Sequence, residues 1–321
     1  MLSYVARRVF LSVPIIIVAS IALFFFVREA GPSPLGKYVT DKDPHVIARV
    51  THELGLDQPI YEQYWHFAKN FVTGNWGDSF VTNASVAGMV RSALWNTTQL
   101  VIWGIVLSLI VAIAVGVYSA ARQYSALDYT FTGLAFIGVS MPTFWFALMA
   151  IQFLGFDLRN WLHASNPIFY TVGIHTPGQG GFFDYIRHLA LPVLTLSVQL
   201  VAGWSRYQRS TMIDVLSADY IRTARAKGVP RRKVLLKHAL RNALIPLTTV
   251  TAVDIGALFG GLIVTETIFG WPGMGRLFVN SLLNGDTNVL LPWMIVTAVF
   301  IVGFNLLADV VYSLLDPRIR Y

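Results

Sequence analysis

Few residues of this 321-residue chain have the types and spacing of catalytic groups. Residues 31–37 (GPSPLGK) imitate a phosphate-binding loop, but Tyr38 stands where the metal-binding Ser or Thr belongs. His52 and Glu53 lack the second histidine of a zinc-protease helix. The seven histidines form no ligand-spaced cluster, and the absence of cysteine excludes thiol catalysis. The sequence therefore predicts no metal, nucleotide or covalent chemistry on this chain.

Polar side chains inside apolar runs are the next candidates. Asp254 lies mid-way along the fifth apolar run, where an ionised carboxylate costs several kcal/mol unless it is partnered or hydrated. One interpretation gives it a hydrogen bond to a neighbouring helix, for which Gln199 and Ser197 are candidate partners. The other makes it line a translocation path and meet the ammonium or amides of a cargo. Gln199 and Asn305 are the other candidate path residues.

A short polar helix carries the third candidate site. Ser217 is a potential N-cap, Asp219 suits the positive end of the helix dipole and Lys227 the negative end. Gly228 fits the left-handed position after the helix, and Pro230 prevents its continuation. The spacing predicts a helix of about three turns over residues 219–227.

This helix has two interpretations. Tyr220, Ala224 and Lys227 share one face, with Thr223 beside it. A membrane-surface helix would be held by anionic lipid through its arginines. The small residues instead favour docking in a groove of another protein, because they permit close backbone approach.

The elements that position these residues are membrane helices. Hydrophobic residues make up 55% of the chain and charged residues only 13%, against about 25% in soluble domains. The net charge of +7 alternates with long apolar runs, which indicates topology and not nucleic-acid binding. We expect an all-α polytopic membrane protein.

Six apolar runs are long enough to predict transmembrane helices. The first could be a signal peptide, but its 19 residues exceed the usual apolar core of about 7–15, so we expect an uncleaved anchor. The fourth contains Pro192 and several polar residues and is expected inside the bundle. The predicted spans are residues 9–27, 98–121, 131–154, 189–204, 244–264 and 291–315.

Charge placement predicts the orientation. With the N-terminus inside, the cytoplasmic segments hold 15 Lys and Arg residues and the short outside loops hold three. Both termini are therefore expected in the cytoplasm. We divide the chain into residues 1–97, an anchor helix with an outer helical segment, and residues 98–321, a transmembrane core with a cytoplasmic loop at 205–243.

The outer segment is too long for a plain connector. Asp43-Pro44 resembles a helix start, Gly55 could end that helix, and Pro59 could open a second one. Two compatible interpretations stay open, a small cap packed on the membrane face and a platform for a soluble partner.

The string DYIRTARAKGV…KHALRNALIP resembles the signature loop of inner-membrane subunits of dipeptide and oligopeptide ABC importers. In ABC importers generally this loop reads E-A-A-x-x-x-G, and its helix couples the permease to the ATPase. Arg222, Thr223 and Ala224 fall on E-A-A and Gly228 on the glycine. The departures at Arg222 and Thr223 favour the peptide and nickel branch. LGLDQPIYEQYWHF with GNWGDSF resembles the outer segment of the first of the two permeases. SMPTFW, ETIFGWPGMGRL and LLDPRIR are similar to strings of the same family.

This resemblance implies the type I ABC importer permease fold in a bacterial inner membrane. It implies a heterodimer with a second permease, two ATPase subunits or domains that carry ATP and Mg, an extracytoplasmic binding protein and surrounding lipid. The coupling helix would use the following residues: Asp219, Tyr220, Arg222, Thr223, Ala224, Lys227 and Gly228. Haem or nickel is the alternative cargo to peptides. A rival class is a secondary transporter with Asp254 as proton carrier, although the sequence shows no internal inverted repeat.

Overall fold

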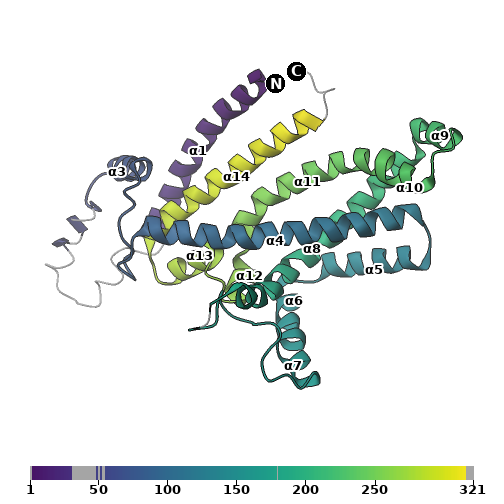
Figure 1. Cartoon of the computed structure of the whole chain (residues 1–321). Coiled ribbons are helices and arrows are strands. Elements are labelled where there is room, and N and C mark those ends of the chain that lie inside the picture. Colours follow the sequence, from purple (N-terminus) through teal and green to yellow (C-terminus); the bar gives the residue numbers. More distant parts are fainter. Residues whose placement is uncertain (1, 31–47, 50, 53–54, 179, 316–321) are drawn as a thin grey trace. The chain divides into compact units, whose positions relative to one another are not determined.

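Helices make up the regular structure of the described part of the chain (Figure 1), which in this computed structural model is residues 2–30, 48–49, 51–52, 55–178 and 180–315. The elements are α1 (Leu2–Ala30), α3 (Ile60–Thr73), α4 (Val86–Ala121), α5 (Ala126–Ser140), α6 (Thr143–Ala150), η2 (Ile151–Asp157), α7 (Leu158–Trp161), α8 (Phe182–Ser217), α9 (Asp219–Ala226), α10 (Arg231–Lys233), η3 (Val234–Ala239), α11 (Leu240–Gly261), α12 (Ile263–Ile268), α13 (Met274–Leu283) and α14 (Thr287–Leu315). The two η elements are π-helices.

Several sequence features lie outside the described residues. They are the phosphate-loop imitation at 31–37, the helix start at Asp43-Pro44 and most of the closing string at 314–320. Gly55 is described, and its φ of 63° fits the helix-ending role expected for it.

Five single helices and one bent pair of the described residues are long and apolar enough to cross a membrane. The predicted count of six spans agrees with this set. The single helices are Ala6–Glu29, Val86–Ala121, Phe182–Ser217, Arg231–Phe259 and Thr287–Val310, and the pair is Ala126–Ser140 with Thr143–Trp161.

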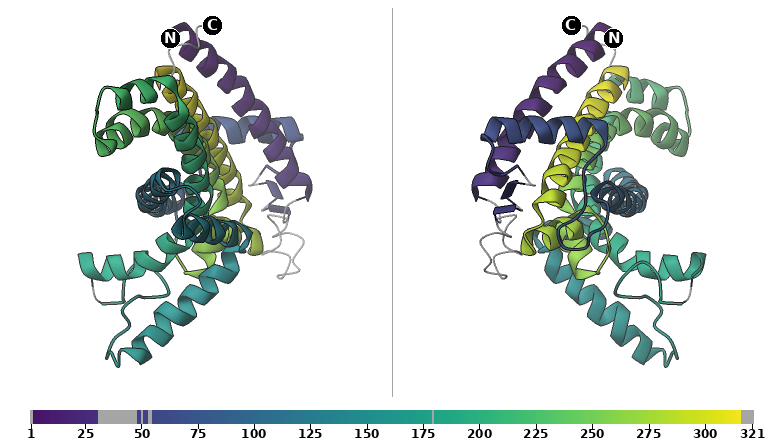
Figure 2. Two further views of the ribbon diagram at one scale, coloured as in Figure 1. Left: turned by 90° about the vertical axis from the view of Figure 1, so that its right-hand side faces the viewer. Right: turned by 90° about the vertical axis from the view of Figure 1, so that its left-hand side faces the viewer.

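The bent pair corrects the third predicted span, which we expected as one helix over residues 131–154. Its two halves meet at an angle of 107°, and Figures 1 and 2 show α6 leaving the direction of α5. Met141 at the break has an extended backbone (φ −80°, ψ 124°), because a residue before proline is pushed out of the helical region. Pro142 then opens α6 with its ring-fixed φ of −61°.

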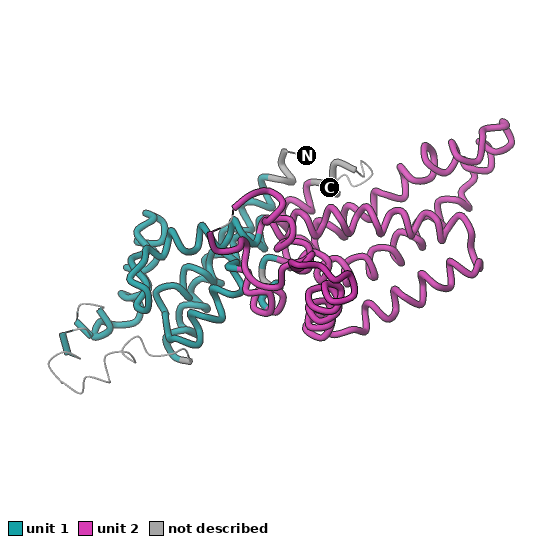
Figure 3. Tube along the Cα trace, turned by 60° about the horizontal axis from the view of Figure 1, so that its bottom comes forward, with its two compact units in different colours: residues 1–97, 259–263, 272–303 teal, residues 98–258, 264–271, 304–321 magenta. Residues whose placement is uncertain are grey.

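The chain forms two compact units, shown in Figure 3. Unit 1 comprises residues 1–97, 259–263 and 272–303, and unit 2 comprises residues 98–258, 264–271 and 304–321. The predicted domain boundary at 97 and 98 stays a prediction, since later segments of the chain are distributed between the units.

In unit 1, α3 packs on α1. Tyr64 and Phe67 of α3 lie against the buried side chain of Phe24, with ring centroids 5.5 Å away in both cases. The Tyr64 hydroxyl is 2.8 Å from the Ser20 hydroxyl. The helix expected after Pro59 therefore packs against the first span, as the cap interpretation requires.

In unit 2, α4 and α8 approach closely through glycines. A Cβ on Gly104 would collide with Leu196, and one on Gly116 would lie 2.7 Å from the Gln208 Cβ. The Ser197 hydroxyl reaches the Gly104 carbonyl at 3.2 Å. In the most apolar stretch of the span Phe182–Ser217, half of the residues are buried, a higher share than in the other single spans. This agrees with the expected position of the helix inside the bundle.

Candidate functional site

The helix α9 is the candidate site for a protein partner, and its start differs from the prediction. Ser217 does not cap it: α8 continues through Ser217, whose hydroxyl donates back to the Asp214 carbonyl at 2.7 Å. Ala218 holds the N-cap position with an extended backbone and no side-chain hydrogen bond. α9 has eight residues: it begins at Asp219 as predicted and ends at Ala226, one residue before the predicted end, so it is shorter than three turns.

The end of α9 forms as the sequence predicts. Gly228 has a φ of 75°, in the left-handed region that favours glycine. Its N–H donates to the Arg225 carbonyl at 3.0 Å, and the Val229 N–H donates to the Ala224 carbonyl at 3.2 Å. These two bonds make a Schellman motif, which satisfies carbonyls at the helix end and fixes where the chain leaves α9.

The faces of α9 differ from the predicted grouping of Tyr220, Ala224 and Lys227. Ile221 is fully buried, and Ala224 is half-buried beside it in the same apolar cluster. Ala224 therefore lies toward the packed side, because it is only about 60° around the helix from Ile221. The outward residues are Asp219, Arg222, Thr223, Ala226 and Lys227, which are all exposed.

The cluster beneath α9 joins it to four other elements of unit 2. Its buried members are Val117 and Ala120 of α4, Met212 of α8, Ile221 of α9, Val234 and Ala239 of η3, and Ala243 of α11. Burial of an aliphatic side chain contributes about 1.5–3 kcal/mol, so this contact holds α9 against its neighbours. A force on α9 therefore acts directly on α4, α8 and α11.

A hydrogen bond adds to this attachment. Tyr220 is 45% exposed, and its hydroxyl accepts a hydrogen bond from the Asn242 amide of α11 at 2.8 Å. Tyr220 therefore lies at the edge between the packed and outward sides of α9.

A buried ion pair braces the same end of unit 2. Both guanidinium contacts from Arg209 of α8 to the Asp128 carboxylate of α5 measure 2.8 Å, and Asp128 is 2% exposed. The Tyr124 N–H donates to the same carboxylate at 2.9 Å. Sequence reasoning missed this pair. Ser125, which accepts from the Asp128 N–H at 3.3 Å, marks the helix start, but nothing local indicates the partner 81 residues away.

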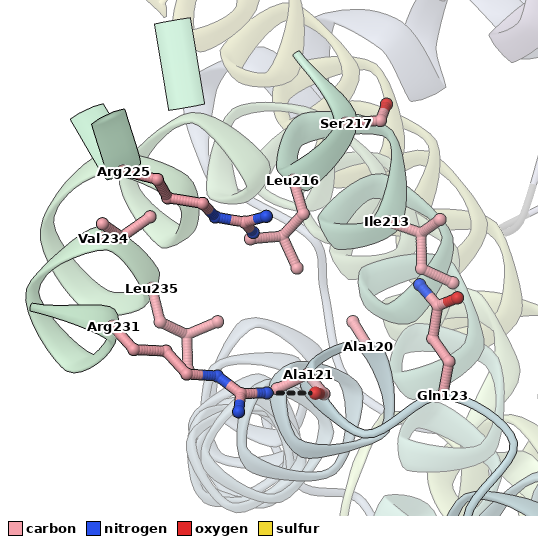
Figure 4. Close-up of a pocket in the computed structure, with 10 residues that line it drawn as sticks. All are labelled: Ala120, Ala121, Gln123, Ile213, Leu216, Ser217, Arg225, Arg231, Val234 and Leu235. Carbon is pink, nitrogen blue, oxygen red and sulfur yellow. Dashed lines mark hydrogen bonds between the residues drawn. The ribbon is translucent and has the colours of Figure 1, made fainter. Parts of the chain in front are cut away.

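Figure 4 shows a cavity of about 450 Å³ between α9 and the ends of α4 and α8. Arg225 and Arg231 extend toward it from α9 and α10, and the Arg231 guanidinium donates to the Ala121 carbonyl at 2.8 Å. Apolar side chains such as Leu216 and Leu235 form much of the remaining wall. The wall of this space thus holds arginines and apolar side chains next to one another.

The three candidate path residues are not brought together by a contact in the structure. The Trp204 indole N–H donates to the Asp254 carboxylate at 2.7 Å. Asp254 thus has the expected hydrogen bond to a neighbouring helix, but not to the suggested partners: the Ser197 hydroxyl donates to the Gly104 carbonyl, and the Gln199 amide donates to the Met141 carbonyl at 3.2 Å. Gln199 and Asn305 are exposed in the single chain.

Within the described residues, no group of three His, Cys, Asp or Glu side chains is placed to hold a metal ion. What the geometry offers is mechanical: a short capped helix with an exposed polar face, attached to several membrane-length helices.

These features define a helical membrane protein that carries a short capped helix, α9, with an exposed polar face. Residues 104–321 match the family described as binding-protein-dependent transport system inner membrane component. Residues 1–101 match the model of the N-terminal part of such membrane components. The chain belongs to this family of permeases, which confirms the predicted resemblance and the type I ABC importer fold.

Relatives of known function cover the whole chain. It is 39% identical over 324 residues to the oligopeptide transport system permease protein AppB of Bacillus subtilis, with 100% of both chains aligned. It is 37% identical to the dipeptide transport system permease protein DppB of Alkalihalophilus pseudofirmus and to the glutathione transport system permease protein GsiC of Escherichia coli, again with full coverage of both chains.

Proposed function

We propose that this chain is the first of two permease subunits in an ATP-driven importer of peptides. The observation that carries the proposal is α9, a capped helix whose outward polar face is exposed while Ile221 fixes it to the transmembrane helices. Full-length relatives named for oligopeptide, dipeptide and glutathione transport support peptide cargo. Haem and nickel stay as alternative cargoes.

The proposed assembly contains a second permease, two ATPase subunits that bind ATP and Mg, and an extracytoplasmic binding protein. Closure of the ATPase pair moves α9. Because Ile221 packs with Met212 of α8 and Val234 of η3, that movement is transmitted to two membrane-spanning segments. The Asp128–Arg209 pair extends the connection from α8 to α5. The translocation cavity changes its access from one side of the membrane to the other.

The proposed orientation has α9 and both termini in the cytoplasm of a bacterial inner membrane. The chain has no cysteine, so single cysteines report position without background from this subunit. In intact cells a membrane-impermeant maleimide should label Trp161→Cys, whose site is 72% exposed, and should leave Thr223→Cys unlabelled until the cells are opened. Labelling of Thr223→Cys in intact cells would reverse the orientation.

Cargo is tested by uptake in cells that lack this subunit. Labelled peptides, haem and nickel are supplied separately, before and after the gene is restored. We expect peptide uptake alone to depend on the subunit. Loss of nickel or haem uptake with normal peptide uptake would reassign the cargo and leave the permease role intact.

A further inference from the structure

A second groove at the α9 end of unit 2 combines a long apolar wall with a cluster of arginines. It has a volume of about 600 Å³ and lies between the last turns of α4 and the segment from α10 to the start of α11. We propose that an anionic phospholipid binds here, with its phosphate at Arg122, Arg231 and Arg232 and an acyl chain along the apolar wall.

The α4 wall runs along the helix axis. Its residues are Ile113, Ala114, Val117, Tyr118, Ala121 and Arg122, spaced so that they form one continuous stripe. Nine residue steps of helix cover about 13 Å, the length of roughly ten methylenes of an acyl chain. Leu235, Leu236 and Leu240 form the facing wall, and Leu236 is 48% exposed in the single chain.

Chain direction places the charges at one end of this groove. The span Val86–Ala121 ends just before Arg122, while the span Arg231–Phe259 begins with Arg231 and Arg232. The cations therefore meet at the membrane surface, and the leucines and Ile113 lie deeper. This distribution matches the polarity of a phospholipid, with its charge at the surface and its hydrocarbon below.

Two of the guanidinium groups are already held in position. Arg231 donates to the Ala121 carbonyl at 2.8 Å. Arg122 lies over the Tyr118 ring at 5.5 Å from its centroid and donates to its hydroxyl at 3.4 Å. None of the described residues that line the groove is acidic. A phosphate therefore meets oriented donors without a competing carboxylate.

The apolar wall selects a lipid over a soluble phosphate, because both of its sides belong to membrane-length helices. A soluble anion would use the arginines and gain nothing from the leucines. The inference does not depend on the cargo of the proposed transporter. The proposed orientation only adds that the lipid belongs to the inner leaflet.

The first test measures retention of phosphatidylglycerol by the purified transporter in native mass spectrometry. Arg122→Gln combined with Arg232→Gln should weaken binding about twenty-five-fold, because each arginine near a membrane surface contributes about fivefold. The matched control is Lys233→Gln with Lys237→Gln, which removes two charges from the same segment outside the groove lining. Equal losses in the two pairs would overturn the proposal.

A second variant tests the groove without removing charge. Ala114→Trp fills the apolar wall and should weaken lipid binding at least tenfold with all three arginines present. Unchanged binding would mean that the arginines only attract lipid to the surface, and the proposal would fail. Glycerol 3-phosphate binding as tightly as the lipid would also overturn it. So would cross-linking of position 114 to the second permease in the assembled complex, since the groove would then be a subunit interface.

Discussion

Gly228 shows how one backbone angle positions the candidate site. Its φ of 75° lets the Schellman bonds form, and a Cβ at this position would have no neighbour within 4 Å. Within the chain, a side chain here is therefore opposed by backbone strain and not by a clash.

We expect Gly228→Val to reduce transport more than tenfold while membrane insertion stays normal. The strain of about 1 kcal/mol or more is relieved by redirecting the exit from α9, which misplaces its outward face. Transport and membrane-bound protein are measured together. Gly133→Ala is the matched control, because Gly133 has equal space and no positive φ. Transport at the wild-type rate in Gly228→Val would show that coupling does not depend on how the chain leaves α9.

Asp254 has a structural partner and still has a second carboxylate oxygen. The Trp204 indole N–H contacts Oδ2 at 2.7 Å, and Asp254 is half-buried. This bond explains how the carboxylate is held within an apolar helix. It uses only Oδ2, so Oδ1 can still accept a hydrogen bond from a cargo.

We expect Asp254→Asn to weaken transport of cargo with a free amino terminus more than cargo with a blocked one. The amide keeps the shape and can still accept from Trp204, so a purely structural role should largely survive. Transport of both cargoes is compared in wild type and variant, with Trp204→Phe as the control that removes the indole N–H, and part of the buried ring volume with it, while the carboxylate stays. Equal losses for both cargoes, or none, would leave Asp254 as a packing residue.

At the scale of elements, the Asp128–Arg209 pair ties α5 to α8. Asp128 is almost completely buried, while the Arg209 side chain is 27% exposed. A buried carboxylate that loses its cation leaves an uncompensated charge, so the pair matters most when one half is removed.

Arg209→Met should destabilise the purified protein by about 3 kcal/mol, the low end for breaking a buried pair because the guanidinium is partly solvated. Thermal unfolding in detergent measures the change. Adding Asp128→Leu should recover part of the loss, since both charges are then absent. The exposed Asp219–Arg222 pair is the control, and Arg222→Met should change stability little. If the loss of stability in the double variant equalled the sum of the two single losses, Arg209 and Asp128 would not be coupled.

On α9, Thr223 is a more specific site for a substitution than Ala224. Ala224→Trp would overpack the cluster around Ile221, so its failure would not distinguish docking from folding. Thr223 is exposed and avoids this problem.

We expect Thr223→Trp to abolish stimulation of the ATPase subunits without lowering the thermal stability of the permease. A large ring on the outward face obstructs a partner surface and lies away from the buried cluster around Ile221. ATPase activity of the reassembled complex and unfolding of the isolated permease are measured in parallel, with Thr73→Trp on α3 as the distant control. Full stimulation by Thr223→Trp would exclude this face from the contact.

For the whole molecule, the isolated chain should bind no ATP and hydrolyse none. The reason is that Tyr38 replaces the Ser or Thr whose hydroxyl would bind the metal, in the only segment of the sequence that resembles a phosphate-binding loop. Adding the second permease and the ATPase subunits should restore hydrolysis. Specific ATP binding by the purified chain, lost on Lys37→Ala, would contradict its interpretation as a transport subunit.

The sequence by itself determined the membrane class, the number of spans and the stop of α9. These features depend on short stretches of chain: apolar length, the glycine at 228 and the proline at 230 act through local solvation and backbone sterics. The same locality explains why the family resemblance could be drawn from short strings.

Only the tertiary structure decided which side of α9 is packed, which groups pair and how sharply the third span bends. Ile221 and Ala224 are turned inward by side chains from α4, α8 and η3, and Arg209 meets Asp128 across 81 residues. Asp254 likewise bonds to Trp204, 50 residues away in the sequence, and not to the suggested Gln199. The SMPTFW string predicted a family but not its 107° bend. Such pairings depend on distances between helices, which no local pattern of residues encodes.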